Sequence, residues 1–233
     1  VLVDALTRRL EALALEPGLR VLVLGGRGAA FCAGADLAWM ARQGAASREA
    51  NREDALCLAR LFAVLDAFPK PTVARVHGAC FGGGLGLVAA CDLAIAARSA
   101  RFCLSEARIG LLPATIGPYV LRAIGHRAAS RYMLTAEAFD AVEAARIGLV
   151  HEAVAEDALD DCIAQRVAAL LACGPRAQRE VKRMLRELAG HPPGAALSAA
   201  TADWIADARA SEEGREGLRA MLEKRSPSWS APG

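Results

Sequence analysis

The sequence has no large excess of charge of either sign. Its 28 lysines and arginines against 26 aspartates and glutamates leave a formal net charge of +2, and the arginines are scattered along the chain. A nucleic-acid-binding surface needs basic side chains massed on one face, so the charge pattern does not indicate one. We therefore expect no nucleic acid among the partners.

Long uninterrupted apolar runs are also missing. The longest, residues 85–97, contains Asp92 and is too short to span a bilayer, so no membrane association is expected. The apolar first fifteen residues are interrupted by charges such as Asp4 and Arg8, and their leucines recur at helical spacing. This pattern predicts an amphipathic helix rather than a signal peptide.

The seven cysteines show no CxxC spacing. Most lie in apolar runs, as Cys57, Cys80 and Cys91 do. This is typical of reduced, buried thiols and predicts a cytoplasmic protein without a disulfide framework or a metal site. No base accompanies Cys80 in the sequence, so we do not interpret it as a nucleophile.

Apolar runs and helical patterns alternate in the first half of the chain. Short continuous apolar runs predict buried strands at 19–26, 72–78 and 93–98, with helices between them and a mobile polar stretch at 43–51. The alternation predicts an α/β fold with a largely parallel sheet. Further along, the pattern predicts mainly helices, at 118–124, 128–134, 138–147, 156–172, 177–188, 197–208 and 211–225.

Two glycine-rich segments, FCAGAD at 31–36 and GACFGGGLGL at 78–87, each follow a predicted strand and precede a predicted helix. Ligands bind at such junctions, where free backbone N–H groups attract negative charge. Side by side, the two could form an oxyanion hole, although the glycines could equally serve only close packing. A single motif, Gly26-x-Gly28, is too incomplete to indicate a dinucleotide site, because Phe31 takes the third glycine's place.

Glu106 follows a short apolar stretch in a glycine- and proline-rich segment. Partial desolvation there would raise the pKa of its carboxyl group, which suits a proton carrier, whereas an exposed loop glutamate is the plainer alternative.

Three segments together resemble the enoyl-CoA hydratase/isomerase superfamily, the crotonases: FCAGADL, KPTVARVHGACFGGGLGLVAACDLAIAA and FCLSEARIGLLPATIGPYVLRAIG. LTAEAFDAVEAARIGLVHEAV and SEEGREGLRAMLEKRSPSW resemble the segments that follow in that family. The resemblance implies a spiral of ββα units over residues 1–165 and a helical C-terminal region over 166–233 that builds trimers or hexamers. The family's first strands have no counterpart here, which predicts an N-terminally incomplete chain.

The resemblance also implies an acyl-CoA thioester as substrate and no cofactor. It implies that the N–H groups of Ala35 and Gly83 form the oxyanion hole and that Glu106 exchanges a proton with the acyl α-carbon. It implies contacts to coenzyme A from Arg27, Ala33, Asp36, Leu37 and Lys224, the last often supplied by a neighbouring subunit. The implied acyl pocket consists of Trp39, Met40, Pro113, Ala114 and Ile116, although Trp39 and Met40 could equally be helix packing.

Gly86 departs from the two-glutamate hydratases of the superfamily, because their first catalytic glutamate falls at this position. With one carboxylate, the chain resembles either a hydratase or a Δ3,Δ2-enoyl-CoA isomerase. The longer segments GGGLGLVAACDLAIAA and LSEARIGLLPATIGPYVLRAIG resemble those of bacterial 3-methylglutaconyl-CoA and isohexenylglutaconyl-CoA hydratases. This resemblance implies that the substrate is a branched acidic 2-enoyl-CoA. We expect the distal substrate carboxylate to orient the water or to fill the room that the missing side chain leaves.

Two further expectations concern the same region. Relatives carry Asn, Gln or His at the position of His77, so a hydrogen bond that braces the loop is expected rather than catalysis. A binding protein that kept the fold and lost the chemistry is a third reading of the chain. The presence of Glu106 together with both small-residue loops argues against it.

Overall fold

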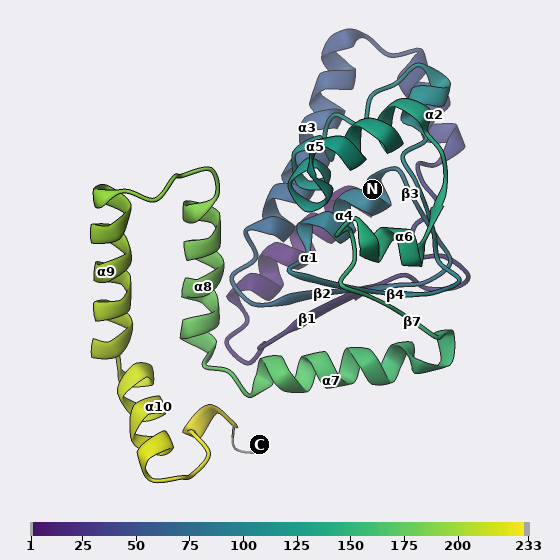
Figure 1. Cartoon of the computed structure of the whole chain (residues 1–233). Coiled ribbons are helices and arrows are strands. Elements are labelled where there is room, and N and C mark those ends of the chain that lie inside the picture. The colour runs from purple at the N-terminus through teal and green to yellow at the C-terminus, as the bar shows by residue number, and fades with distance from the viewer. Residues whose placement is uncertain (1, 231–233) are drawn as a thin grey trace.

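The computed structural model describes residues 2–230. Its strands and helices alternate in the first half of the chain and give way to helices in the second (Figure 1). The elements are α1 (Leu2–Leu15), β1 (Leu22–Gly25), α2 (Leu37–Gly44), α3 (Arg48–Asp66), β2 (Thr72–Val76), β3 (Ala79–Phe81), α4 (Gly83–Ala90), β4 (Leu93–Ala97), β5 (Arg101–Cys103), α5 (Gly117–Thr135), β6 (Phe139–Asp140), α6 (Ala141–Arg146), β7 (Glu152–Val154), α7 (Leu159–Leu171), α8 (Pro175–Leu188), α9 (Ala195–Ala210) and α10 (Glu212–Leu222). Short 3-10 helices span Glu106–Ile109, Glu156–Ala158 and Ser228–Ser230.

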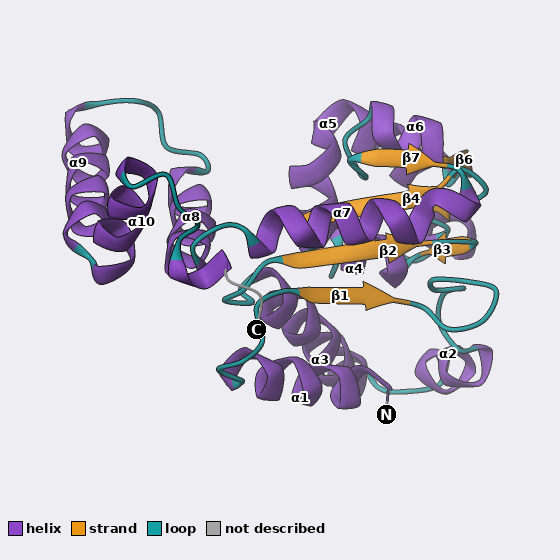
Figure 2. Cartoon of the chain, turned by 90° about the horizontal axis from the view of Figure 1, so that it is seen from below, coloured by secondary structure: helices purple, strands orange, loops and turns teal. Residues whose placement is uncertain are grey.

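The strands form two sheets. One is parallel throughout, in the order β1-β2-β4-β7, and the other has the order β3-β5-β6, with β3 and β5 parallel and β6 antiparallel. Helix α7 contacts β2 and β4 from one side of the parallel sheet (Figure 2), while α4 packs against β2. Because helices lie over β2 and β4, most residues of these two strands are apolar and buried, and the predicted α/β architecture is confirmed.

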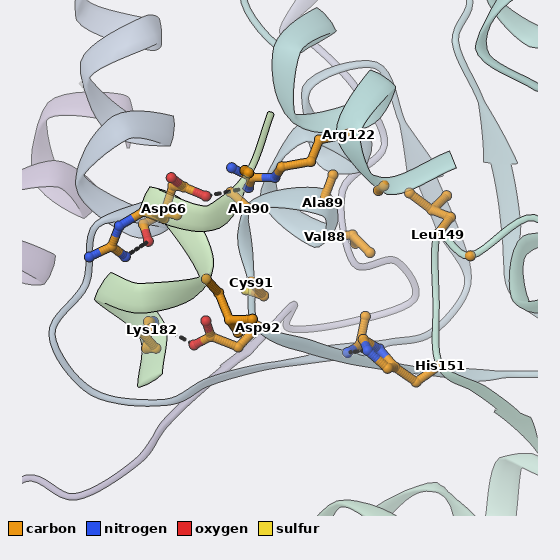
Figure 3. A pocket seen from close by; sticks show the side chains of 16 residues that line it. Asp66, Val88, Ala89, Ala90, Cys91, Asp92, Arg122, Leu149, His151 and Lys182 are labelled. Carbon is orange, nitrogen blue, oxygen red and sulfur yellow. Dashed lines mark hydrogen bonds and ion pairs between the residues drawn. The ribbon is translucent and has the colours of Figure 1, made fainter. Parts of the chain in front are cut away.

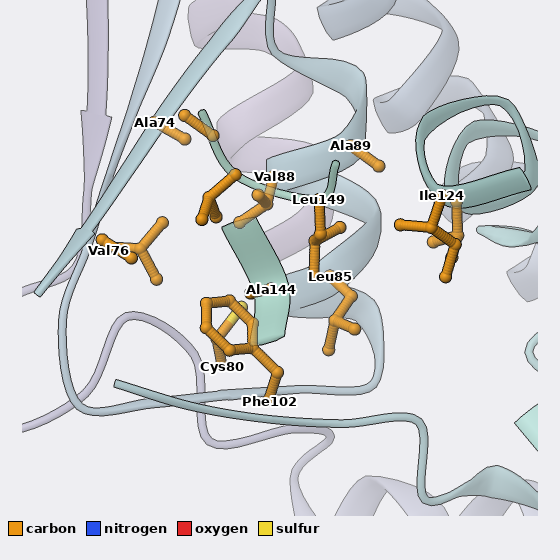
Figure 4. Packing of buried hydrophobic residues seen from close by; sticks show 14 of the residues in the cluster. Ala74, Val76, Cys80, Leu85, Val88, Ala89, Phe102, Ile124, Ala144 and Leu149 are labelled. Atoms are coloured by element: carbon orange, nitrogen blue, oxygen red, sulfur yellow. The ribbon is translucent and has the colours of Figure 1, made fainter. Parts of the chain in front are cut away.

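The main core lies between α4, the sheets and α5. Cys80, Leu85, Val88 and Phe102 are all at most 1% exposed and face one another (Figure 4). Each large apolar side chain buried in this way stabilises the fold by about 1.5–3 kcal/mol. This core fixes α4, and therefore the loop before it, against β2 and α5.

Helix α8 is attached to the segments around β2 and β4 by an ion pair whose lysine is buried. Lys182 Nζ donates to Asp92 Oδ2 at 2.5 Å and to the carbonyl oxygen of Lys70 at 3.0 Å. Asp92 Oδ2 also accepts hydrogen bonds from the backbone N–H and the hydroxyl of Thr72. The Lys182 ammonium is thus neutralised although the side chain is only 9% exposed.

The two helices after α8 stand off from the sheet in both views (Figures 1 and 2). Helices α8 to α10 expose large apolar side chains: Val181, Leu185, Ile205, Leu218, Met221 and Leu222. The division into a core over 1–165 and a helical region over 166–233 stays a prediction. Of the described residues, no helix is long and apolar enough to cross a membrane.

Several element boundaries differ from those predicted. Within α5, by contrast, the break predicted between 118–124 and 128–134 is confirmed, because Gly125, with a φ of 70° and a ψ of 165°, is not helical. The helix predicted at 138–147 begins only at Ala141, because Phe139 and Asp140 pair with β5 as a strand. The stretch predicted as mobile at 43–51 instead ends α2 and begins α3, which Ser47 caps by accepting from the Ala50 N–H.

Candidate active site

The two glycine-rich segments lie side by side. The Cys32 N–H donates to the Ala79 carbonyl and the Phe81 N–H donates to the Cys32 carbonyl, both at 2.9 Å. Cys32 and Cys80 are thereby paired in parallel as an isolated bridge. The segment that carries Ala35 is therefore hydrogen-bonded to β3, the strand that leads directly into α4.

Glycines permit this close approach. A Cβ atom at Gly84 would lie 2.8 Å from the Cβ of Cys32, and one at Gly78, where φ is +58°, would lie 2.0 Å from the Ala29 carbonyl oxygen. The second glycine-rich segment thus needs its bare backbone for packing as well as for access. Of the two readings offered for these glycines, packing alone is sufficient for Gly78 and Gly84.

Gly83 is the first residue of α4, and Gly82 before it has a φ of +51°. The first four N–H groups of a helix have no acceptor within it, so the Gly83 N–H is available to a ligand oxygen. Ala35 lies in the exposed loop just before α2. Asp36 caps that helix, its carboxylate accepting from the Trp39 N–H at 2.7 Å. The backbone of Leu37 begins α2, and its side chain lies outside the described ones.

Glu106 lies against the start of α4. A Cβ atom at Gly82 would be 3.3 Å from Glu106 Oε1, and the Gly82 N–H donates to the Cys103 carbonyl at 2.9 Å. Glu106 Oε2 is buried and has no hydrogen-bond partner among the described residues. Burial raises the pKa of this carboxyl above 4.5, and a hydrogen bond with its own backbone partly offsets that rise. Glu106 is therefore half-buried rather than an exposed loop glutamate, and it can hold a proton nearer to neutral pH.

Gly86 faces no empty space. A Cβ atom there would lie 2.2 Å from Ile116 Cγ2 and 2.8 Å from Phe62 Cε1. The expectation that a substrate fills room at this position is wrong, because Ile116 and Phe62 already occupy it. Phe62 was not identified from the sequence, since its helical spacing on α3 marks it only as a core residue.

The residues expected in the acyl pocket differ in exposure. Trp39 and Pro113 are half-buried, Ala114 is exposed, and Ile116 is buried against Gly86. Trp39 Nε1–H donates to Asp54 Oδ1 of α3 at 3.2 Å, which holds α2 against α3. Met40 follows Trp39 on α2 and is also half-buried.

The His77 side chain braces the loop after β1, which leads into the first glycine-rich segment, so the expected loop-bracing hydrogen bond is present. Its Nε2 lies 2.9 Å from the Gly28 carbonyl oxygen and its Nδ1 lies 3.3 Å from Arg75 Nη1. Because a guanidinium can only donate, Nδ1 accepts, and the proton on Nε2 is donated to Gly28. Asp160 in turn pairs with Arg75 Nε at 2.5 Å. In the sequence, this chain of hydrogen bonds from Asp160 through Arg75 and His77 to Gly28 is indicated only by Arg75, a charged residue inside an apolar strand.

Of the residues expected to contact coenzyme A, Lys224 lies apart from the others, which belong to the loop between β1 and α2 or to the start of α2. Arg27 and Ala33 are exposed in the loop after β1, whereas Lys224 follows α10 and has a φ of +54°. Figures 1 and 2 both place α10 far from β3 and α2. Their role in binding stays a prediction, and for Lys224 it requires a neighbouring subunit.

A cavity of about 470 Å³ lies at the other end of α4 (Figure 3). It is lined by residues that include Val88, Cys91, Asp92, Arg122, His151 and Lys182, and by none of Ala35, Gly83 or Glu106. Its charged residues are largely engaged: Asp92 pairs with Lys182, and Arg122 pairs with Asp66. Burial raises the pKa of the Cys91 thiol to about 12, so it is not reactive. We therefore place the candidate site at the N-terminal end of α4, where the two loops and Glu106 meet.

Among the described residues, no group of three or more His, Cys, Asp or Glu side chains is arranged to hold a metal ion. The chemistry available at the candidate site consists of backbone N–H donors and one carboxyl group with a raised pKa. Together these suit the formation of an oxyanion with transfer of a proton nearby.

Comparisons with known proteins agree with this chemistry. A family model described as enoyl-CoA hydratase/isomerase matches residues 1–232. An enoyl-CoA hydratase from Shewanella pealeana has a solved structure with a TM-score of 0.94 and 45% identity, covering 97% of this chain and 85% of that one. The corresponding values for AtuE of Pseudomonas aeruginosa are 0.93, 40%, 98% and 89%. The 2,3-dehydroadipyl-CoA hydratase of Escherichia coli is 32% identical over 228 residues, which are 96% of this chain and 86% of that protein.

Proposed function

Because the chain belongs to the enoyl-CoA hydratase/isomerase superfamily, the crotonases, we propose that it adds water across the double bond of a 2-enoyl-CoA thioester. The observation that carries this proposal is the place of Glu106. Its carboxyl group has a raised pKa and lies beside Gly82, the residue that immediately precedes the free N–H of Gly83. A carboxyl group that can donate a proton thus lies next to a backbone N–H that can donate a hydrogen bond to an oxyanion.

In the proposed reaction, the N–H groups of Ala35 and Gly83 hold the thioester oxygen. Water attacks the β-carbon, and the electron pair of the double bond moves toward the thioester, whose oxygen gains negative charge. Glu106 gives its proton to the α-carbon and regains one from the attacking water, which leaves a 3-hydroxyacyl-CoA. Loss of one oxyanion donor typically costs about 3 kcal/mol of transition-state stabilisation.

We propose an acidic acyl group, branched as in 3-methylglutaconyl-CoA. The relative from Escherichia coli supports the acidic part, since its name places a second carboxylate on its substrate. The distal carboxylate would help to orient the water that Glu106 activates. Arg27, Ala33, Asp36 and Leu37 would contact coenzyme A, and Lys224 would do so across the interface of a trimer or hexamer.

Isomerisation of a 3-enoyl-CoA is a second candidate function. The observation that favours it is the filled space at Gly86, which leaves Glu106 as the carboxyl group next to α4. One base can carry a proton from the α-carbon to the γ-carbon, so this reaction needs no water.

A panel of CoA thioesters tests both functions: crotonyl, 3-methylcrotonyl, 3-methylglutaconyl and 3-hexenoyl. We expect 3-hydroxyacyl products from the 2-enoyl esters, with 3-methylglutaconyl-CoA the fastest. Rearrangement of 3-hexenoyl-CoA without any hydration would make the protein an isomerase. No reaction with any of the four would contradict both proposals.

A further inference from the structure

Two apolar side chains fill the inner side of α4 beneath its first two turns. Phe62 of α3 is 0% exposed, and Ile116 at the start of α5 is 2% exposed. A Cβ atom at Gly83 would lie 4.0 Å from Phe62 Cζ, and one at Gly86 would touch Phe62 and Ile116 together. The Phe62 ring therefore lies beneath both glycines. We call Phe62 and Ile116 the apolar plug.

Glu106 lies next to Gly82, the residue before Gly83, under which the Phe62 ring lies. A buried oxygen without a partner, such as its Oε2, attracts water wherever the surroundings admit it, whereas an apolar wall keeps water out. On the outer side, the 3-10 helix is followed by Leu111 and Leu112, which are 54% and 80% exposed. We propose that the apolar plug keeps water off the α4 side of Glu106, so that this carboxyl group meets water only from its outer side.

The neighbouring charges offer no simpler explanation. The titratable and charged side chains on the elements around Glu106 come from β5, the 3-10 helix, α5 and the two glycine-rich segments. They are Arg101, Cys103, Arg108, Tyr119, Arg122, His126, Arg127, Arg131, Tyr132, Cys32, Asp36 and Cys80. Helix α4 itself contributes none between Gly83 and Ala90. Burial is the largest cause of the raised pKa of Glu106, and no charged neighbour is a cause. Burial rather than a neighbouring charge therefore raises this pKa, and in the proposal the apolar plug supplies the α4 side of that burial.

Two nearly isosteric variants, Ile116→Val and Ile116→Thr, separate water from shape. Both leave a similar gap, but the threonine hydroxyl gives water a partner, while the gap beside valine stays dry. The titration midpoint of Glu106 is measured by NMR on protein with 13C-labelled glutamate carboxyls, and the signal is assigned by its loss in Glu106→Gln. We expect a midpoint above 4.5 in the parent protein, and one lower by about 0.5 unit or more in Ile116→Thr but not in Ile116→Val.

Ile163→Thr is the matched control. Ile163 of α7 is 7% exposed and belongs to a separate cluster with Val73 and Ile95, so this variant is expected to leave the midpoint unchanged. The proposal is overturned if Ile116→Thr leaves the midpoint where it is, or if Ile163→Thr lowers it as much.

A second pair of variants serves if Ile116→Thr does not fold. Phe62→Tyr places a hydroxyl under Gly83, and Phe68→Tyr places one in another buried cluster. We expect only Phe62→Tyr to lower the midpoint, and equal midpoints would overturn the plug.

The inference rests on the proposed function only in taking Glu106 as the proton carrier. The titration needs no turnover, so the two can fail separately. A protein inactive on all four thioesters would refute the proposed function. An unchanged titration midpoint of Glu106 in Ile116→Thr would refute the role of the apolar plug, even if the protein is an active hydratase.

Discussion

At the scale of single residues, the candidate site depends on glycines that stand next to functional groups. Gly82 makes room for the Glu106 carboxyl, which would lie 3.3 Å from a Cβ atom there. Gly86, one turn further along α4, instead makes room for Phe62 and Ile116. The sequence shows a run of equivalent glycines, and only the contacts distinguish them.

Gly82→Ala is expected to displace Glu106. Its φ of +51° strains an alanine, and the new Cβ atom pushes the carboxyl by a few tenths of an ångström. Because misplacement of a catalytic group by about 1 Å can cost roughly 100-fold in rate, we expect this smaller shift to lower kcat by less than that, with little change in KM. Gly190→Ala, with a φ of +79° and nothing nearby, is the control. Equal kcat values in the two variants would contradict this role.

Gly86→Ala is expected to destabilise the protein. The added methyl group would overlap Ile116 Cγ2, and overpacking of this kind costs about 1–3 kcal/mol. In a chain of this size each kcal/mol lowers the melting temperature by roughly 2–4 °C, which thermal unfolding detects. Gly44→Ala, in α2 with nothing within 4 Å, should not lower it. A melting temperature unchanged by Gly86→Ala would show that Ile116 and Phe62 can move aside without a measurable loss of stability.

At the scale of elements, segments with a helical periodicity or a continuous apolar run could be predicted, and segments without either pattern could not. The helix at Leu2–Leu15 follows from its leucine spacing, and β2 and β4 follow from their apolar runs. The sequence does not predict the strand Ala79–Phe81, because three residues carry no periodic signal and the strand forms by pairing with β5 and with Cys32. The break between 118–124 and 128–134 could be predicted because a glycine stands there, and Gly125 has non-helical φ and ψ angles of 70° and 165°.

The candidate site divides in the same way. Its loops and Glu106 could be predicted because small residues and a carboxylate near strand–helix junctions can be recognised within one short segment of sequence. Phe62 could not be, because its contact with Gly86 joins segments more than twenty positions apart. Arg75 and Asp160 were missed for the same reason, since they meet only once β2 and α7 pack together.

The His77 brace connects those elements to the oxyanion loop. His77→Leu leaves the Gly28 carbonyl without its donor, and one such hydrogen bond contributes about 0.5–1.5 kcal/mol. We expect KM for the CoA thioester to rise by roughly three- to tenfold, with kcat nearly unchanged. His77→Gln, which keeps a donor, should restore most of the affinity. Equal KM values for His77→Leu and the parent would show that the loop holds its shape without the brace.

At the scale of the whole molecule, ion pairs hold the outer elements in place and link stability to pH. Glu143 at the start of α6 accepts from Arg146 at 2.5 Å and from the Tyr132 hydroxyl at 2.5 Å. These contacts, that of Arg146 first, lower the pKa of Glu143 from 4.5 to about 2. A carboxyl group with a lowered pKa stabilises the folded state above its unfolded value and loses that effect as pH falls through its folded value.

Glu143→Gln therefore removes a stabilisation that depends on pH. We expect the parent protein to lose unfolding free energy more steeply than the variant between pH 4.5 and about 2. Urea unfolding at several pH values measures both curves. Parallel curves over this range would mean that Glu143 titrates alike in the folded and unfolded chains.

The most direct test of the account is hydration of 3-methylglutaconyl-CoA by the parent protein and by Glu106→Gln, with the 3-hydroxyacyl product identified by mass spectrometry. Glutamine keeps the shape of the side chain and cannot transfer the proton, and general acid catalysis contributes typically about 10²–10⁴-fold. The account predicts that Glu106→Gln binds the thioester as the parent does and turns it over at least about 100-fold more slowly. A variant with the full rate would contradict the assignment of Glu106 as the proton carrier.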